Sequence, residues 1–108
     1  MKLKINRATI IIDGDVSDPL EVWNGLLLAA NAARLTILST DYHIFYPEGF
    51  SGTIILGESH IAIHTFPEHG KAWIEIATCD ESGDSVPRFI AAARVMPFVE
   101  ELEVVSRG

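Results

Sequence analysis

The alternation of apolar and polar residues along the chain predicts strands at its beginning, in its middle and at its end. Residues 3–12 include the β-branched run Thr9 to Ile12 and are followed by the turn residues Asp13-Gly14-Asp15, which predicts a first strand. Turn sequences at Pro47-Glu48-Gly49 and Pro67-Glu68-His69-Gly70 indicate that the strands beside them run antiparallel. The further predicted strands cover residues 35–45, 53–56, 61–66, 71–79 and 98–105.

Two segments have the periodicity of helices. The first is predicted over residues 19–33, because Asp18 is a good capping residue and Pro19 suits the first helical position. Its apolar residues recur at spacings of three and four, which predicts one buried face made of Leu20, Trp23, Leu27 and Ala30. The second helix is predicted to begin at Pro87 and to end near Met96, before Pro97.

The order β-α-β-β-β-β-α-β is typical of an α+β fold. We expect a two-layer sandwich in which an antiparallel sheet carries both helices on one face. The length of 108 residues fits a single domain over residues 1–108. Since two helices cover only one face of the sheet, something else must cover the other face, and this is often a second copy of the chain.

Alternation within residues 71–79 separates two groups of side chains. Ala72, Ile74, Ile76 and Thr78 share the face that we expect to enter the core. Cys79, the only cysteine, shares the opposite face with Trp73, Glu75 and Ala77. The thiol is therefore expected outside the main core, although a small buried hydrophobe is the commonest fate of a lone cysteine.

Charge and composition exclude several classes of protein. Fifteen acidic residues against eight Lys and Arg give a net charge of −7, which is compatible with a cationic substrate and argues against nucleic-acid binding. One cysteine permits no internal disulfide, and no apolar run has the length of a signal segment or membrane span, so we expect a cytoplasmic protein. The histidines and the cysteine lack metal-ligand spacing, and no metal site is predicted.

Candidate chemistry is concentrated in the stretch from Glu58 to Glu68. Ser59 lies between two predicted strands, and its hydroxyl could attack the carbonyl carbon of Glu58 if the intervening peptide were strained. His64 is the candidate base, and Cys79 is a candidate acid from the next strand, so we expect the fold to bring these three residues together. From the residues alone, the simpler interpretation is that Ser59 is a polar residue at a strand end and His64 a hydrogen-bonded sheet histidine.

The run Glu-Ser-His-x-x-x-His-Thr-Phe-Pro-Glu, followed by Thr78-Cys79, resembles the small prokaryotic S-adenosylmethionine decarboxylases. These enzymes cleave their own chain and make a pyruvoyl cofactor, which serves as an electron sink. The resemblance implies cleavage between Glu58 and Ser59, with Ser59 as the pyruvoyl precursor, and formation of the aminopropyl donor for spermidine synthesis. It implies further that His64 and Ser51 assist processing and that Cys79 donates the proton after decarboxylation. It also implies a homodimer of cleaved chains, which agrees with the uncovered face of the sheet.

The same resemblance implies a substrate site in which Phe45 and Phe66 enclose the adenine ring and Glu68 binds the ribose hydroxyls. Sheet packing is the alternative role for both phenylalanines. The chain departs from the family pattern at Phe66, where tryptophan is usual, and at Asp80, where glycine often stands. A third departure replaces a Gly-x-His element with Asn6-Arg7-Ala8-Thr9.

Two other functions remain open at this point. A smaller ring at Phe66 and an added carboxylate at Asp80 would suit a substrate with a distal cation, so the same scaffold could decarboxylate ornithine or arginine. Alternatively, the chain could be an uncleaved homologue with a binding or regulatory role. The presence of Ser59, His64 and Cys79 together favours an enzyme over this last possibility.

Overall fold

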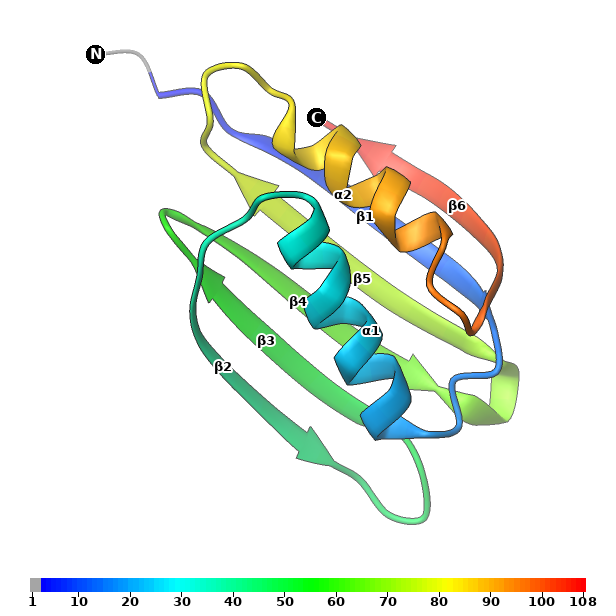
Figure 1. Cartoon of the computed structure of the whole chain (residues 1–108). Coiled ribbons are helices and arrows are strands. Elements are labelled where there is room, and N and C mark those ends of the chain that lie inside the picture. The colour runs from blue at the N-terminus through cyan, green and yellow to red at the C-terminus, as the bar shows by residue number, and fades with distance from the viewer. Residues whose placement is uncertain (1–2) are drawn as a thin grey trace.

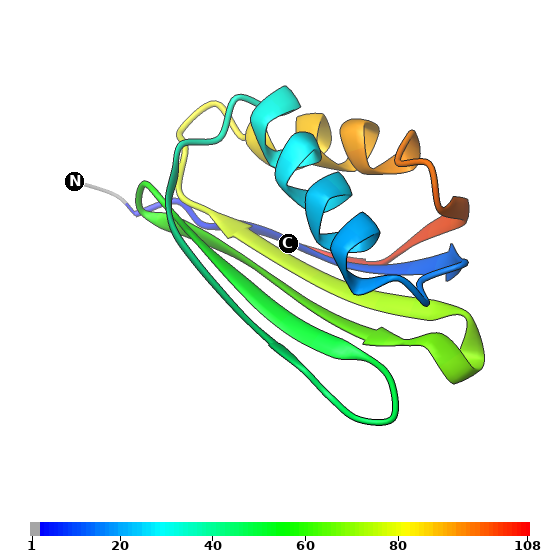
Figure 2. The same cartoon turned by 60° about the horizontal axis from the view of Figure 1, so that its bottom comes forward.

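Six strands form one antiparallel sheet, and two helices cover one of its faces (Figures 1 and 2). The computed structural model describes residues 3–108. The strand order across the sheet is β2-β3-β4-β5-β1-β6. This arrangement confirms the predicted α+β sandwich. The elements are β1 Asn6–Gly14, α1 Pro19–Ala32, β2 Ile37–Ile44, β3 Phe50–Leu56, β4 Ser59–Phe66, the short 3-10 helix η1 Pro67–His69, β5 Lys71–Thr78, α2 Ser85–Arg94 and β6 Val99–Arg107.

Alternating side chains of the central strands form the core beneath the helices. Along β5, the face predicted to enter the core is buried, and Trp73 and Glu75 lie on the other face, as predicted. The face without helices, called the open face below, retains exposed apolar side chains on neighbouring strands. These are Ile55 of β3, Phe66 of β4 and Trp73 of β5.

Strand β3 begins at Phe50, three residues before the predicted start at Thr53. The stretch Ser51-Gly52 has the composition of a turn, but Gly52 serves close packing here. A Cβ atom at Gly52 would lie 2.4 Å from a ring carbon of Trp23. Trp23 is buried, as predicted, and its ring packs over this glycine.

Helix α1 begins where the sequence predicted, because the Asp18 carboxylate accepts hydrogen bonds from the main-chain N–H groups of Leu20 and Glu21. Its predicted buried face is partly wrong, since Leu20 remains 56% exposed. Apolar residues occur all around this helix, so periodicity alone does not select the face that meets the sheet. The buried side chains of α1 are Val22, Trp23, Leu26, Ala29 and Ala30.

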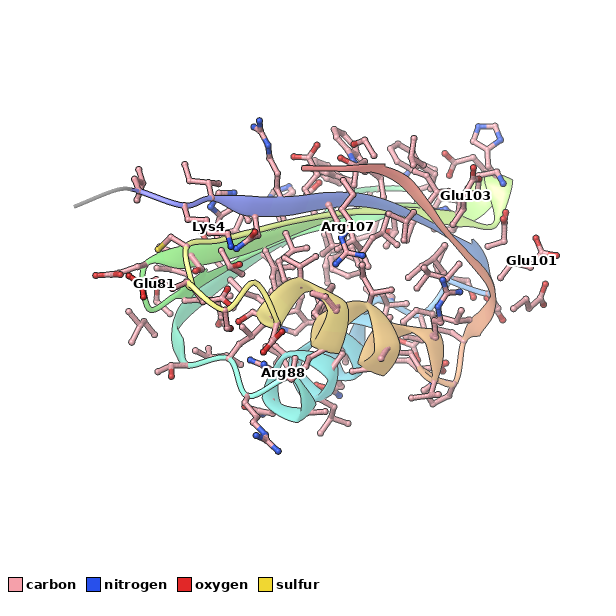
Figure 3. All side chains as sticks on the ribbon, turned by 90° about the horizontal axis from the view of Figure 1, so that it is seen from above. Lys4, Glu81, Arg88, Glu101, Glu103 and Arg107 are labelled. Carbon is pink, nitrogen blue, oxygen red and sulfur yellow. The ribbon has the colours of Figure 1, made fainter. Side chains whose placement is uncertain are left out.

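Helix α2 begins at Ser85, two residues before the predicted start, and ends at Arg94. The reason is a distant cap: the Asp80 carboxylate accepts hydrogen bonds from the main-chain N–H groups of Asp84 and Ser85. Arg88 of α2 donates from Nε to the carbonyl oxygen of Ala33, which ties the two helices together (Figure 3). Within residues 3–108, neither helix is long and apolar enough to cross a membrane.

Candidate active site

Ser59 is the first residue of β4 and follows a two-residue turn, Gly57-Glu58, between paired residues Leu56 and Ser59. Glu58 has a φ of 58°, in the left-handed region that L-residues other than glycine rarely adopt. Such a conformation costs on the order of 1 kcal/mol and is common at functional sites. The peptide bond between Glu58 and Ser59 therefore follows a residue with a strained backbone conformation. Such strain is the condition under which we expect the Ser59 hydroxyl to attack.

Cys79 lies across from this turn, just after the end of β5. Its Sγ is 2.9 Å from the main-chain carbonyl oxygen of Glu58, to which the thiol donates a hydrogen bond. The Glu58 carboxylate lies slightly farther away, 3.7 Å from Sγ. A hydrogen bond to this carbonyl withdraws electrons from its carbon and makes it a better target for a nucleophile.

The Cys79 thiol is kept protonated by its surroundings. Partial burial is the main cause that raises its pKa, and the neighbouring Glu58 carboxylate raises it further. Hydrogen bonding to Ser59 acts in the opposite direction and is weaker. A neutral thiol donates a hydrogen bond or a proton, whereas a thiolate does neither, so these surroundings suit the role of an acid.

Two adjoining hollows open beside the turn, and Glu58, Ser59, Thr78 and Cys79 line both. The first has a volume of about 330 Å³ and extends towards the open face. The second, of about 230 Å³, extends towards the helices. The first is completed by Leu3, Ile5, His60 and Ala77, and the second by Arg34, Leu35, Thr36, Leu56, Gly57, Asp80 and Ser85.

Asp80 organises the segment that follows Cys79. Burial opposes its charge, but hydrogen bonds from Thr78, Ser82 and Ser85 together outweigh this and lower the pKa of its carboxyl well below the ordinary range. Both carboxylate oxygens are thus occupied within the loop and the helix cap. Asn6 adds a hydrogen bond from Nδ2 to the Asp80 main-chain oxygen at 3.1 Å. Asp80 is therefore a structural residue, and it does not point a free carboxylate at a substrate.

His64 lies away from Ser59, contrary to the expectation that the fold of one chain brings them together. Five residues of extended strand separate them, which corresponds to roughly 16 Å. His64 is instead opposite Ser51, whose Oγ is 2.6 Å from its Nδ1. The ring of His64 lies against Trp73, with centroids 4.9 Å apart. The two residues predicted to assist processing therefore form a pair of their own on the open face.

The predicted substrate-binding residues lie near the Ser51–His64 pair rather than near Ser59. Phe45 follows β2 and packs on His43, with ring centroids 4.8 Å apart. His43 pairs with Ser51 across β2 and β3. Phe66 ends β4, two residues beyond His64, and Glu68 follows in η1. Phe45 and Phe66 are 47% and 41% exposed, so neither side chain is buried in the core.

Comparison with known proteins relates this arrangement to one family. Residues 13–98 match the family described as S-adenosylmethionine decarboxylase. The chain belongs to this family. The matched segment contains both groups of site residues, from Phe45 to Cys79.

Individual members of the S-adenosylmethionine decarboxylase family show how far the similarity extends. An S-adenosylmethionine decarboxylase proenzyme of Thermodesulfovibrio yellowstonii is 39% identical over 85 residues, which cover 79% of this chain and 61% of that protein. The proenzyme of Persephonella marina is 50% identical over 64 residues, covering 59% and 46%. The chain therefore spans between about half and three-fifths of the length of these relatives.

The fold agrees with a solved member of the family. The crystal structure of the adenosylmethionine decarboxylase from Aquifex aeolicus VF5 superposes with a TM-score of 0.78 at 27% identity. The superposition covers 95% of this chain and 88% of that one. The six-stranded sheet and both helices thus follow the family architecture.

Sequence reasoning missed three residues of the site. In the sequence Asn6 is only a departure from the family pattern, yet it donates a hydrogen bond to the Asp80 carbonyl. Lys4 contacts the same loop, because its Nζ lies 3.3 Å from the main-chain oxygen of Glu81 (Figure 3). Arg34 lines the second hollow, and its signal was readable: it directly follows the predicted helix 19–33, at a position where glycine is favoured.

Proposed function

We propose that this chain is a self-processing, pyruvoyl-dependent S-adenosylmethionine decarboxylase. The observation that carries the proposal is the hydrogen bond from the Cys79 thiol to the carbonyl of Glu58, a residue held in a left-handed conformation directly before Ser59. A strained peptide, a polarised carbonyl and an adjacent hydroxyl are the components of an acyl shift. Family membership supports the same chemistry.

The proposed cleavage has three stages. The Ser59 Oγ attacks the Glu58 carbonyl carbon, the C–N bond breaks, and the peptide becomes an ester with a free Ser59 amine. A base removes the Ser59 α-proton, and the Cβ–O bond breaks to release the Glu58 carboxylate and leave dehydroalanine. Tautomerisation and addition of water then expel ammonia and leave a pyruvoyl group at the new amino terminus.

The residues of the cleft fit such a group. Once formed, the pyruvoyl group would supply an electrophilic carbonyl for the substrate amine and an acceptor for the electron pair released with CO2. The Cys79 thiol, whose raised pKa favours the neutral form, would deliver a proton to the former α-carbon. Leu3, Ile5 and Ala77 give the first hollow an apolar wall.

A second copy of the chain is part of the proposal. One chain holds Glu58, Ser59 and Cys79 at one end of the open face and Ser51 with His64 towards the other. If two open faces stack around a twofold axis, the second copy places its His64 beside Ser59 of the first. The same second copy then also contributes its Phe45, Phe66 and Glu68 to that site. The exposed side chains of Ile55, Phe66 and Trp73 supply an apolar surface for this contact.

Intact-mass measurement of the purified protein tests the proposal. We expect two fragments that divide between Glu58 and Ser59, with the C-terminal fragment blocked at its amino end, and a single full-length mass for Ser59→Ala. CO2 release should follow with S-adenosylmethionine and not with ornithine or arginine. A chain that stays intact after prolonged incubation would instead support an uncleaved homologue. Turnover of only the basic amino acids would contradict the substrate.

A further inference from the structure

Among residues 3–108, two residues other than glycine adopt a left-handed backbone conformation, and both line the second hollow. Glu58 has a φ of 58° and Arg34 a φ of 63°. Each conformation is unfavourable for a residue with a Cβ atom. Their coincidence in one hollow suggests that Arg34 serves the site as well as the end of a helix.

The backbone places Arg34 beside the scissile turn. Helix α1 ends with hydrogen bonds from the Arg34 N–H to the carbonyl of Asn31 and from the Leu35 N–H to that of Ala30. The segment leaving the helix then passes the β3–β4 turn (Figure 1), where the Gly57 N–H donates to the Thr36 carbonyl at 3.1 Å. The position of Arg34 relative to Glu58 is therefore fixed by main-chain bonds.

The second hollow is lined by more acidic than basic residues. Two acidic residues, Glu58 and Asp80, line it, and Arg34 is its one basic residue. The carboxylate of Asp80 is engaged by Thr78, Ser82 and the start of α2. In the described part of the chain, Lys71 forms an ion pair with Asp13, far from this hollow. The Arg34 guanidinium is thus available to a further anion.

We propose that Arg34 binds the α-carboxylate that self-cleavage creates at Glu58. This inference rests on the proposed function, since cleavage replaces a neutral amide at Glu58 with a carboxylate. The new charge arises next to the Glu58 side chain and Asp80, so it is repelled unless a cation is close. A guanidinium binds a carboxylate through two parallel hydrogen bonds. Arg34 thereby holds the new chain end in the second hollow, clear of the first hollow and its substrate.

A purely structural role for Arg34 makes a different prediction. A cation at the end of α1 also interacts with the helix dipole, whose negative end lies there. That interaction is the same before and after cleavage. Only a bond to the new carboxylate increases the contribution of Arg34 to stability after cleavage.

The experiment compares Arg34→Gln in the otherwise unchanged chain and in Ser59→Ala, with melting temperatures measured at low salt. In the cleaved protein we expect the substitution to lower the melting temperature by about 3–5 °C, and in Ser59→Ala by less than about 1 °C. Arg34→Lys should restore part of the loss. Arg94→Gln, which removes a cation at the end of α2, should shift both backgrounds equally.

Three outcomes would overturn the inference. Equal shifts for Arg34→Gln in both backgrounds would leave only the helix-dipole role. A block of cleavage by Arg34→Gln would place its action before the carboxylate exists. Absence of cleavage in the unsubstituted chain would overturn the proposed function together with the inference, whereas normal cleavage with equal shifts would overturn the inference alone.

Discussion

The thiol of Cys79 donates a hydrogen bond to the main-chain oxygen of Glu58, with Sγ 2.9 Å from that oxygen. The contact joins the residue after β5 to the turn between β3 and β4, and it polarises the carbonyl that Ser59 would attack. In the proposed reaction the same thiol also donates the proton after decarboxylation. The proposal thus gives one side chain a role in two successive reactions, and substitutions should separate them.

Cys79→Ala should still self-cleave, but about tenfold more slowly, because it loses one neutral hydrogen bond to the attacked carbonyl. It should turn over S-adenosylmethionine poorly, since no acid remains to protonate the product carbon. Cys79→Ser is the matched variant, because it retains a donor and should cleave faster than Cys79→Ala. Fragment formation over time and CO2 release measure the two steps. Unimpaired turnover by Cys79→Ala would contradict its role as acid.

His64 should act on Ser59 of another copy. His64→Ala and Ser59→Ala should each remain full length when expressed alone. Co-expressed with distinguishable tags, they form mixed dimers in which an intact Ser59 faces an intact His64. We expect the His64→Ala chain to be cleaved in the mixture, as read by intact mass. If it stays whole while mixed dimers are recovered, a base within the same chain is responsible.

Removal of the Glu58 side-chain charge should make the Cys79 thiol more acidic, since that carboxylate raises its pKa. The test uses Glu58→Gln in the Ser59→Ala background, so that the chain stays whole. At a fixed pH below the pKa of the thiol, alkylation of Cys79 by iodoacetamide should be faster in this variant. Glu48→Gln, in the β2–β3 loop, is a control that should leave the rate unchanged.

Asp80→Asn should destabilise the fold by about 1 kcal/mol at pH 7, because both carboxylate oxygens accept hydrogen bonds and the NH2 group of asparagine cannot replace one of them as an acceptor. The pKa of Asp80 is lowered in the folded chain, so its carboxylate adds stability that is complete above its ordinary pKa near 4. This contribution is lost as the pH falls below that value. Urea unfolding should therefore show a smaller loss between pH 5 and pH 3 for Asp80→Asn than for the unsubstituted chain. An equal loss of stability in the two proteins would show that the Asp80 carboxylate contributes nothing to the pH dependence.

Gly52→Ala should destabilise the protein by about 1–3 kcal/mol, because the added methyl group meets the Trp23 ring at 2.4 Å. Gly57→Ala is the matched control: the nearest atom to its Cβ is 4.0 Å away, on Thr36. Its effect on the free energy of unfolding should stay within about 0.5 kcal/mol. Chemical denaturation of both variants in the Ser59→Ala background keeps cleavage out of the comparison.

Strand and helix content was readable from the sequence because it depends on local patterns. Alternation in residues 71–79 correctly separated the buried side of β5 from the side that carries Trp73. The Asp18 cap marked the start of α1 to the residue. Errors arose where a distant residue decides: Asp80 moves the start of α2 to Ser85, and Trp23 requires glycine inside β3.

The sequence by itself determined which residues are the candidates for the chemistry, because the serine, histidine and cysteine stand at the spacing that resembles the family. Only the tertiary structure decided how they are grouped. An extended strand separates residues five apart by roughly 16 Å, so Ser59 and His64 lie apart in one chain, whereas strand pairing brings Cys79 to the Glu58 carbonyl across 21 positions. Proximity in sequence is thus a poor guide to proximity in a sheet, where neighbours are set by hydrogen bonds between strands.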